Sequence, residues 1–198
     1  MSVLTFQKKV TTPTAVDRQP TVVSWEDFQK KYLTREDGFK YEWLNGVVEK
    51  TERTMDPTQF YIQYNLDELL SRLKQQNPDL GMFTSEGDTF FGNKHRRPDI
   101  AYYTKEQLRQ GRKGIKPVPE FVVEVISKTD NINRVNGKID NYFAAGVKII
   151  WHVFPLLEKV YVYENDTTIR ICSGSDMCSA EAVISGFALP TDAIFKEP

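Results

Sequence analysis

The chain has 198 residues, of which 40% are hydrophobic and 27% charged, and its net charge is −1. This balance is ordinary for a globular protein, and no apolar run approaches the roughly 20 residues that cross a bilayer, which excludes a membrane-spanning protein. Residues 1–21 show neither strand nor helix periodicity, and they lack the apolar core of a secretion signal. We therefore expect a mobile N-terminal arm over 1–21, one domain over 22–198, and a cytoplasmic location.

The first half of the chain alternates between helical and strand patterns. Capping residues followed by apolar residues at helical spacing predict helices, and Asn-Gly or Gly-Asn pairs between apolar runs predict hairpin turns. The predicted elements are a short helix after Ser24, a hairpin over 39–52 that turns at Asn45-Gly46, a long helix from Asp56-Pro57 to about Gln76, and two or three strands over 81–103 with a turn at Gly92-Asn93.

The second half continues with helices between strands, which predicts an α/β fold in the broad sense, with a mixed sheet and helices packed on it. A glycine after a helical pattern indicates the end of a helix. The predicted elements are a short helix and basic loop over 104–117, a buried strand over 119–127, a helix that ends at Gly146, a strand over 147–154, a hairpin around Asn165-Asp166, and a short closing helix before the C-terminal end.

Positive charge is concentrated in one part of the chain. Residues 93–138 contain eleven Lys or Arg against five Asp or Glu, although the whole chain is slightly acidic. A ligand with a phosphate backbone favours such a segment, and a solvated basic surface explains the same pattern about equally well.

Two carboxylates stand out because their surroundings are apolar. Glu124 lies within the strand-like run PEFVVEVIS, and Asp99 follows Pro98 at the start of the run IAYY. An unpaired charge in such a strand costs several kcal/mol, so Glu124 needs a partner. Carboxylate oxygens are the ligands that Mg²⁺ prefers, and two acids at neighbouring strand ends predict a magnesium site. Taken singly, Asp99 also fits an ordinary Pro-Asp turn, and Glu124 a strand acid paired with an arginine.

A lysine beside these acids would complete a site for phosphodiester hydrolysis. Side chains alternate along a strand, so the expected position is two residues after Glu124, where the chain has Ile126. Lys138, on the following predicted helix, reaches the same place if it faces the sheet with Val135 and Tyr142. Lys138 is therefore the candidate, and a solvated helix lysine is its alternative.

The chain resembles a known family along nearly its whole length. The series YEWLNG, RPDIAYY, PEFVVEVIS, a lysine before DNYFAAGVKIIWHV, and SGFALP is similar to the Uma-type family of putative restriction endonucleases, within the PD-(D/E)XK nuclease superfamily. This resemblance implies a restriction-endonuclease-like fold with a central mixed sheet flanked by helices. It also implies Mg²⁺-dependent or Mn²⁺-dependent DNA cleavage, often by a homodimer.

The resemblance also implies roles for single residues. It maps the metal-binding acids onto Asp99 and Glu124, the displaced lysine onto Lys138, and an early assisting glutamate onto Glu42. Two alternatives stay open, namely a catalytically inactive nucleic-acid-binding module on the same scaffold and an assembly domain without nucleic acid. The inactive module is considered because Lys128 and Gly137 stand where the family usually has a proline and a helix-forming residue. From the basic segment we expect four residues to hold the DNA backbone: Arg96, Arg97, Arg112 and Lys113.

Overall fold

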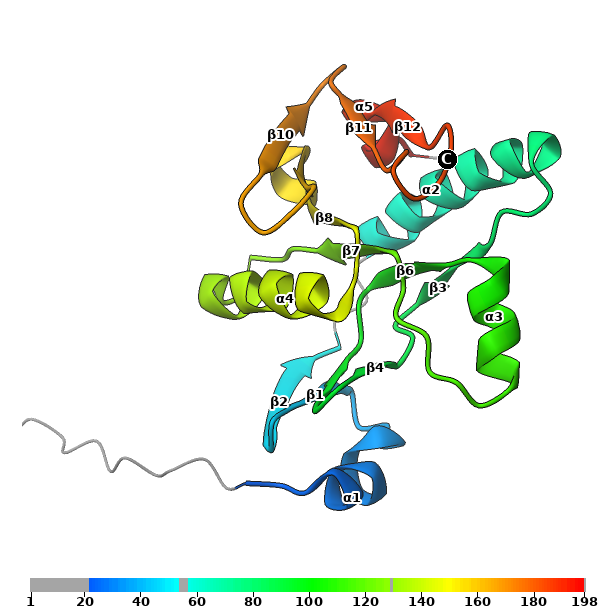
Figure 1. Cartoon of the computed structure of the whole chain (residues 1–198). Helices are drawn as coiled ribbons and strands as arrows, with labels where there is room; N and C mark the ends of the chain where they lie inside the picture. Colours follow the sequence, from blue (N-terminus) through cyan, green and yellow to red (C-terminus); the bar gives the residue numbers. More distant parts are fainter. Residues whose placement is uncertain (1–21, 54–56, 129, 198) are drawn as a thin grey trace, which may run out of the picture.

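The computed structural model describes residues 22–53, 57–128 and 130–197 (Figure 1). A six-stranded sheet has the order β10-β9-β8-β7-β6-β3, and a four-stranded sheet beside it has the order β2-β1-β5-β4. In the large sheet β7 and β8 are parallel, whereas the other neighbours pair antiparallel. The strands are β1 (Phe39–Leu44), β2 (Val47–Glu52), β3 (Met82–Ser85), β4 (Thr89–Phe91), β5 (Lys94–Arg96), β6 (Ile100–Tyr103), β7 (Phe121–Val125), β8 (Ile149–Phe154), β9 (Lys159–Tyr163), β10 (Ile169–Ser173), and the separate pair β11 (Met177–Ser179) and β12 (Ala188–Pro190).

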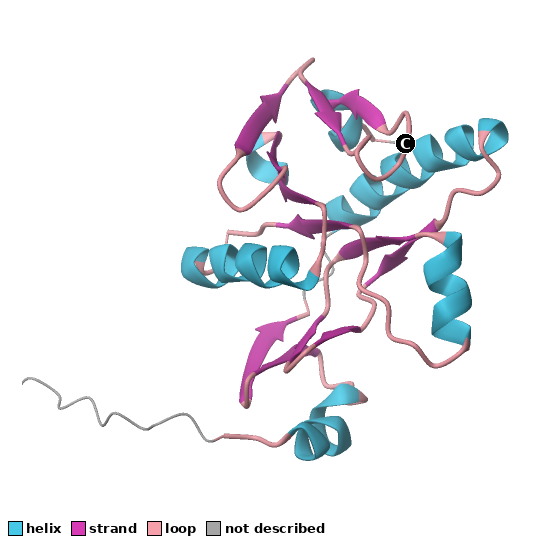
Figure 2. Ribbon diagram, viewed as in Figure 1, coloured by secondary structure: helices cyan, strands magenta, loops and turns pink. Residues whose placement is uncertain are grey.

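Helices cover both faces of the large sheet (Figure 2). One face packs against α2, which places Ile62, Leu66 and Leu70 in the main core, and the other face packs against α4. The helices are α1 (Trp25–Phe28), which continues as a π-helical segment (Gln29–Leu33), α2 (Pro57–Gln76), α3 (Lys105–Arg112), α4 (Ile132–Ala145) and α5 (Thr191–Phe195), with a 3₁₀ turn at Pro155–Leu157.

Alternation along β7 decides which way Glu124 faces. Phe121, Val123 and Val125 belong to the core under α2, whereas Val122 belongs to the smaller core under α4. Because successive side chains of a strand point to opposite faces, Glu124 lies on the α4 side together with Val122. The apolar run therefore buries a carboxylate directly beneath a helix.

The fold class expected from the sequence is confirmed, and most of the expected elements are present. The Asn45-Gly46 turn has positive φ at both residues (49° and 92°), as a tight hairpin requires. The long helix extends from Pro57 to Gln76. The expected arm over 1–21 and the Asp56 cap lie outside the described residues.

One region differs from the expectation. The stretch 81–103 contains four short strands rather than two or three, and they do not share a sheet. β4 and β5 form a hairpin that joins β1 in the small sheet, whereas β3 and β6 pair in the large one. Period-two alternation shows that a strand exists, but it does not show which sheet the strand joins. In the part of the chain that the structure describes, no helix is long and apolar enough to span a membrane.

Candidate functional site

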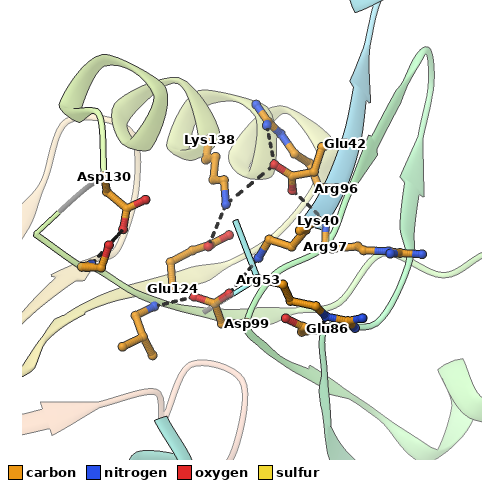
Figure 3. Close-up of polar contacts among 12 residues, drawn as sticks. Lys40, Glu42, Arg53, Glu86, Arg96, Arg97, Asp99, Glu124, Asp130 and Lys138 are labelled. Carbon is orange, nitrogen blue, oxygen red and sulfur yellow. Dashed lines mark hydrogen bonds and ion pairs between the residues drawn. The ribbon is translucent and has the colours of Figure 1, made fainter. Parts of the chain in front are cut away.

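Asp99 and Glu124 lie next to each other on one face of the large sheet (Figure 3). β6 pairs antiparallel with β7, with Ile100 opposite Val123. One more step in this register places Asp99, directly before β6, opposite Glu124. Ile100 and Tyr102 pack into the α2-side core, so alternation directs Asp99 to the α4 side, where Glu124 also lies.

Asp99 is held by a lysine and by a backbone amide. Lys40 Nζ, from β1 of the small sheet, lies 2.8 Å from Asp99 Oδ1, and the Val125 amide donates to Asp99 Oδ2 at 2.8 Å. Burial by itself raises the pKa of Asp99, but the ammonium groups of Lys40 and Lys138 outweigh it and hold that pKa below the usual value. Burial opposes the charge of Lys40 too, yet the carboxylates around it raise its pKa. Both groups are therefore charged at neutral pH.

Glu124 is held from α4, where Lys138 and Tyr142 are one helical turn apart and share a face. Lys138 Nζ lies 2.8 Å from Glu124 Oε2, and the Tyr142 hydroxyl donates to Glu124 Oε1 at 2.6 Å. Glu124 is only 3% exposed, and this burial, reinforced by the nearby charges of Asp99 and Glu42, raises its pKa despite Lys138. The two acids therefore differ in proton affinity.

Glu42 lies behind the pair and is 1% exposed. Arg96 Nη1 donates to Glu42 Oε2 at 3.0 Å, the Arg97 amide donates to Oε1 at 2.8 Å, and Lys138 Nζ is 3.8 Å from Oε2. Burial works against the ionised form, but Lys138 and Arg96 lower the pKa of Glu42 to about 2. Glu42 is therefore ionised at neutral pH, and it attracts the Lys138 ammonium from the side opposite Glu124.

A cavity of about 410 Å³ opens onto the acid pair. Acids and cations line it in equal number, and most are already joined in ion pairs. Lys40 pairs with Asp99, Lys138 with Glu124, Arg53 with Glu86, and Arg134 with Asp130. The acidic lining residues are Glu52, Glu86, Asp99, Glu124 and Asp130, and the basic ones are Lys40, Lys50, Arg53, Arg134 and Lys138.

The structure brings together three of the residues expected from the sequence, because Asp99, Glu124 and Lys138 all line this cavity. Glu42 touches Lys138 from outside the lining.

The four residues expected to contact DNA do not line this cavity. Arg96 is 2% exposed and bridges Glu42 and Glu49, so its guanidinium does not face solvent. Arg97 bonds to Asp88 and to the Leu33 carbonyl. Arg112 and Lys113 are exposed at the end of α3, outside the cavity lining.

Sequence reasoning missed Lys40, and it missed the rim cations Lys50, Arg53 and Arg134. A signal for Lys40 did exist. It lies two residues before Glu42 in the strand FKYEWL, so the two side chains share a face of β1. Lys50 and Arg53 lie outside the basic segment 93–138, and charge density along the chain therefore does not point to them.

The structure is similar to a solved protein described as "a putative nuclease belonging to DUF820" from Anabaena variabilis ATCC 29413. The TM-score is 0.72 at 16% sequence identity, over 86% of this chain and 96% of that one. The molecule therefore shares the restriction-endonuclease-like fold of that protein.

Comparison with protein families gives a narrower result. A model of the family Uma2, described as "Putative restriction endonuclease", matches residues 25–192. The chain belongs to this family, and family and fold together support a nuclease function. A search of curated proteins finds no significant match.

The donor set at the acid pair can be tested against a magnesium ion. Mg²⁺ commonly uses one or two protein carboxylates and completes its shell with water and substrate phosphate, so it does not require a cage of protein ligands. Within residues 22–53, 57–128 and 130–197 no three His, Cys, Asp or Glu side chains gather for a metal. Asp99 and Glu124 supply two neighbouring carboxylates at a polar cavity. Each oxygen has a second lone-pair position beside its present hydrogen bond, so the residues fit the ion.

Proposed function

We propose that this protein is a Mg²⁺-dependent or Mn²⁺-dependent endonuclease that hydrolyses phosphodiester bonds of DNA. The observation that carries the proposal is that Asp99, directly before β6, Glu124 of β7 and Lys138 of α4 all line one cavity. Family membership and the nuclease fold support the same reaction class. A homodimer and a cytoplasmic location belong to the proposal as well, on the resemblance and the sequence alone.

Asp99 and Glu124 would hold the metal ion. When bound, such an ion lowers the pKa of a water ligand and neutralises charge on the phosphate. Lys138, 2.8 Å from Glu124 and 3.8 Å from Glu42, is fixed by two carboxylates where it can orient the water or a phosphate oxygen. Glu42 assists by holding Lys138. Tyr142 acts as a positioning residue, because its hydroxyl fixes the orientation of the Glu124 carboxylate.

Lys40 adds a second ammonium that sequence reasoning did not include. Its ammonium lies 2.8 Å from Asp99, and the residue lines the cavity. Preorganised cations stabilise charge that develops on a phosphoryl group. We therefore assign phosphate stabilisation to Lys40, and phosphate contacts along the rim to Lys50, Arg53 and Arg134. Arg112 and Lys113, which are exposed outside this cavity, stay predicted backbone contacts beside these four.

The test is cleavage of supercoiled plasmid with Mg²⁺, with Mn²⁺, and after chelation of divalent metal. Asp99→Asn and Glu124→Gln each remove one carboxylate charge with little change of shape, and we expect each to lower the cleavage rate at least about hundredfold. Lys138→Gln should lower the rate while leaving metal binding in place. Glu52→Gln is the matched control, because Glu52 lines the same cavity outside the acid pair.

Two results would contradict the proposal, namely cleavage that survives chelation or equal rates for Asp99→Asn and Glu52→Gln. The ion pairs that neutralise Lys40 and Lys138 favour a second candidate, an inactive module that only binds nucleic acid. That candidate predicts salt-sensitive DNA binding without metal and no cleavage with either ion.

A further inference from the structure

A second hollow lies on the other side of the small sheet, away from the acid pair. It has a volume of about 300 Å³, at the lower end of the range of small-molecule sites. Its aromatic lining residues are Trp25, Trp43, Phe90 and Phe91. Asn93 of the β4–β5 turn, Lys94 at the start of β5 and Lys116 after α3 line it as well. We call this hollow the aromatic pocket.

Strand pairing explains why aromatic rings meet there. Trp43 of β1 is opposite His95 of β5, and His95 is opposite Phe90 of β4, so the three form a row across the small sheet. Trp43 lies on the face opposite to Glu42, because neighbouring side chains alternate. Trp25 covers the row, with ring centroids 5.3 Å from Trp43 and 5.7 Å from Phe90. Trp25 and Phe90 are only partly buried, so ring surface remains open to a ligand.

The charged residues that line the aromatic pocket are all positive. None of its lining residues is Asp or Glu, whereas Lys94 and Lys116 both line it. Lys116 Nζ lies 3.8 Å from the centroid of the Phe90 ring and 5.8 Å from that of Trp25. The cavity at Asp99 and Glu124 differs in this respect, since its cations are balanced by acids. A ligand for the aromatic pocket should therefore combine a flat ring with a negative charge.

We propose that the aromatic pocket binds one unpaired nucleotide of a nucleic acid. The Trp25 and Phe90 rings are nearly perpendicular, at 80°, so the base stacks on one of them and packs against the other from its edge, while Lys94 and Lys116 hold a phosphate. A nucleotide unites both required features, and stacking on aromatic side chains is tolerant of base identity. The Asn93 amide offers a donor and an acceptor to the edge of the base. This inference rests on the proposed function only in taking nucleic acid as the ligand, because it uses none of the residues at the acid pair.

The experiment is a titration of the full chain with a short single-stranded oligodeoxynucleotide in the presence of a chelator, so that no strand is cut. Stacking should quench tryptophan fluorescence, and a deoxynucleoside monophosphate should do so more weakly. Lys116→Glu and Lys94→Glu should each weaken binding about tenfold, and Phe90→Leu should do the same while largely preserving side-chain volume. Lys30→Glu, an equal charge change at an exposed residue outside the pocket, should stay within about twofold.

The inference is overturned if Lys116→Glu and Phe90→Leu bind the oligonucleotide like the wild type, or if the wild type shows no quenching. Matched duplex DNA should quench less than the single strand, and equal quenching would also count against an unpaired nucleotide. The plasmid assay reports on the acid pair separately. Cleavage without quenching refutes only the aromatic pocket, and quenching without cleavage refutes only the nuclease.

Discussion

Lys40 is the residue that most changes the picture of the site. It is 8% exposed, and its ammonium sits 2.8 Å from Asp99, in the field of Glu124 and Glu42 as well. A buried ion pair contributes little net stability, but removing one partner leaves an uncompensated charge and is strongly destabilising. Lys40 therefore keeps Asp99 ionised, and it also competes with any cation that approaches Asp99.

Lys40→Gln should accordingly have two opposite effects. Without metal it should lower the free energy of unfolding by on the order of 3 kcal/mol, because Asp99 loses its counter-charge. Affinity for Mn²⁺ should rise about tenfold, because a positive charge beside the ligand is gone. Calorimetric titration and the shift of the melting temperature with Mn²⁺ measure both effects, and the shift should exceed that of the wild type.

Lys50→Gln is the matched control, since Lys50 lines the same cavity but is exposed and rests on the Phe39 ring. It should change Mn²⁺ affinity by no more than about threefold. Weaker Mn²⁺ binding by Lys40→Gln than by the wild type would show that Lys40 supports the metal ligands rather than competing with them.

Single residues differ in how far the sequence reveals them. The place of Asp99 and Glu124 at one site could be predicted, because an unpaired carboxylate inside an apolar run costs free energy and such a run can be recognised from neighbouring residues alone. The contact between Lys40 and Asp99 spans 59 positions and joins two sheets, so no spacing rule connects the two residues. Arg96 was misleading because it belongs to the basic segment, yet it is used internally between Glu42 and Glu49.

Among the elements, α4 does most to organise the site. Asn131 caps its first turn, and Gly146 ends it with a positive φ of 102°. Val135, Ile139 and Tyr142 are buried on the face toward the sheet, and Lys138 reaches Glu124 from the same helix. Gly137 interrupts the helix-forming sequence directly before Lys138, and nothing lies within 4 Å of a Cβ added there.

Gly137→Ala should therefore stabilise the protein. Alanine has room, has the higher helix propensity, and restricts the unfolded chain, which together contribute about 0.5–1 kcal/mol. A chain of this length should melt about 2–4 °C higher per kcal/mol gained. Differential scanning calorimetry measures the change.

Gly146→Ala provides the comparison with opposite sign. Space is equally open there, but the left-handed backbone at Gly146 costs an alanine about 1–2 kcal/mol, so this variant should melt lower than the wild type. If both alanine variants shift the melting temperature in the same direction, backbone conformation at these two positions does not control stability as stated.

The sequence predicts elements better than it predicts their partners. α2, α4 and the β1–β2 hairpin follow from caps, periodicity and turn residues that are adjacent in the chain. The alternation over 81–103 predicts two or three strands, but β4 and β5 belong to the small sheet because β5 pairs with β1, which is distant in sequence. The π-helical segment after α1 has no recognisable sequence signal.

For the whole molecule, the burial of His152 makes the free energy of unfolding depend on pH. His152 is 1% exposed beside Glu124 in the β7–β8 register, and burial, helped by the charge of Lys138, lowers its pKa to about 4. A folded-state pKa below the ordinary 6.5 means that the unfolded chain takes up the proton first. The contribution of His152 is therefore complete above pH 6.5 and declines as the pH falls toward 4.

Between pH 7.5 and pH 5, His152 should account for a loss of about 2 kcal/mol in the free energy of unfolding. His152→Phe retains a ring against Tyr163, whose centroid is 4.8 Å away, and removes the titrating group. Urea unfolding at the two pH values should show a smaller loss for the variant than for the wild type. An equal loss in both proteins would place the pH dependence on other groups.

Asp99 and Glu124 differ in how far along the chain their hydrogen-bonding partners lie. Glu124 receives its ammonium and hydroxyl from α4, 14 and 18 positions later, within one strand–helix unit. Asp99 pairs with Lys40 of the small sheet, which lies 59 positions earlier in the chain. Closing the longer loop costs more conformational entropy, so during folding the surroundings of Glu124 can assemble while Asp99 is still solvated. The cavity at Asp99 and Glu124 therefore reaches its final balance of charges only when the small sheet packs against the large one.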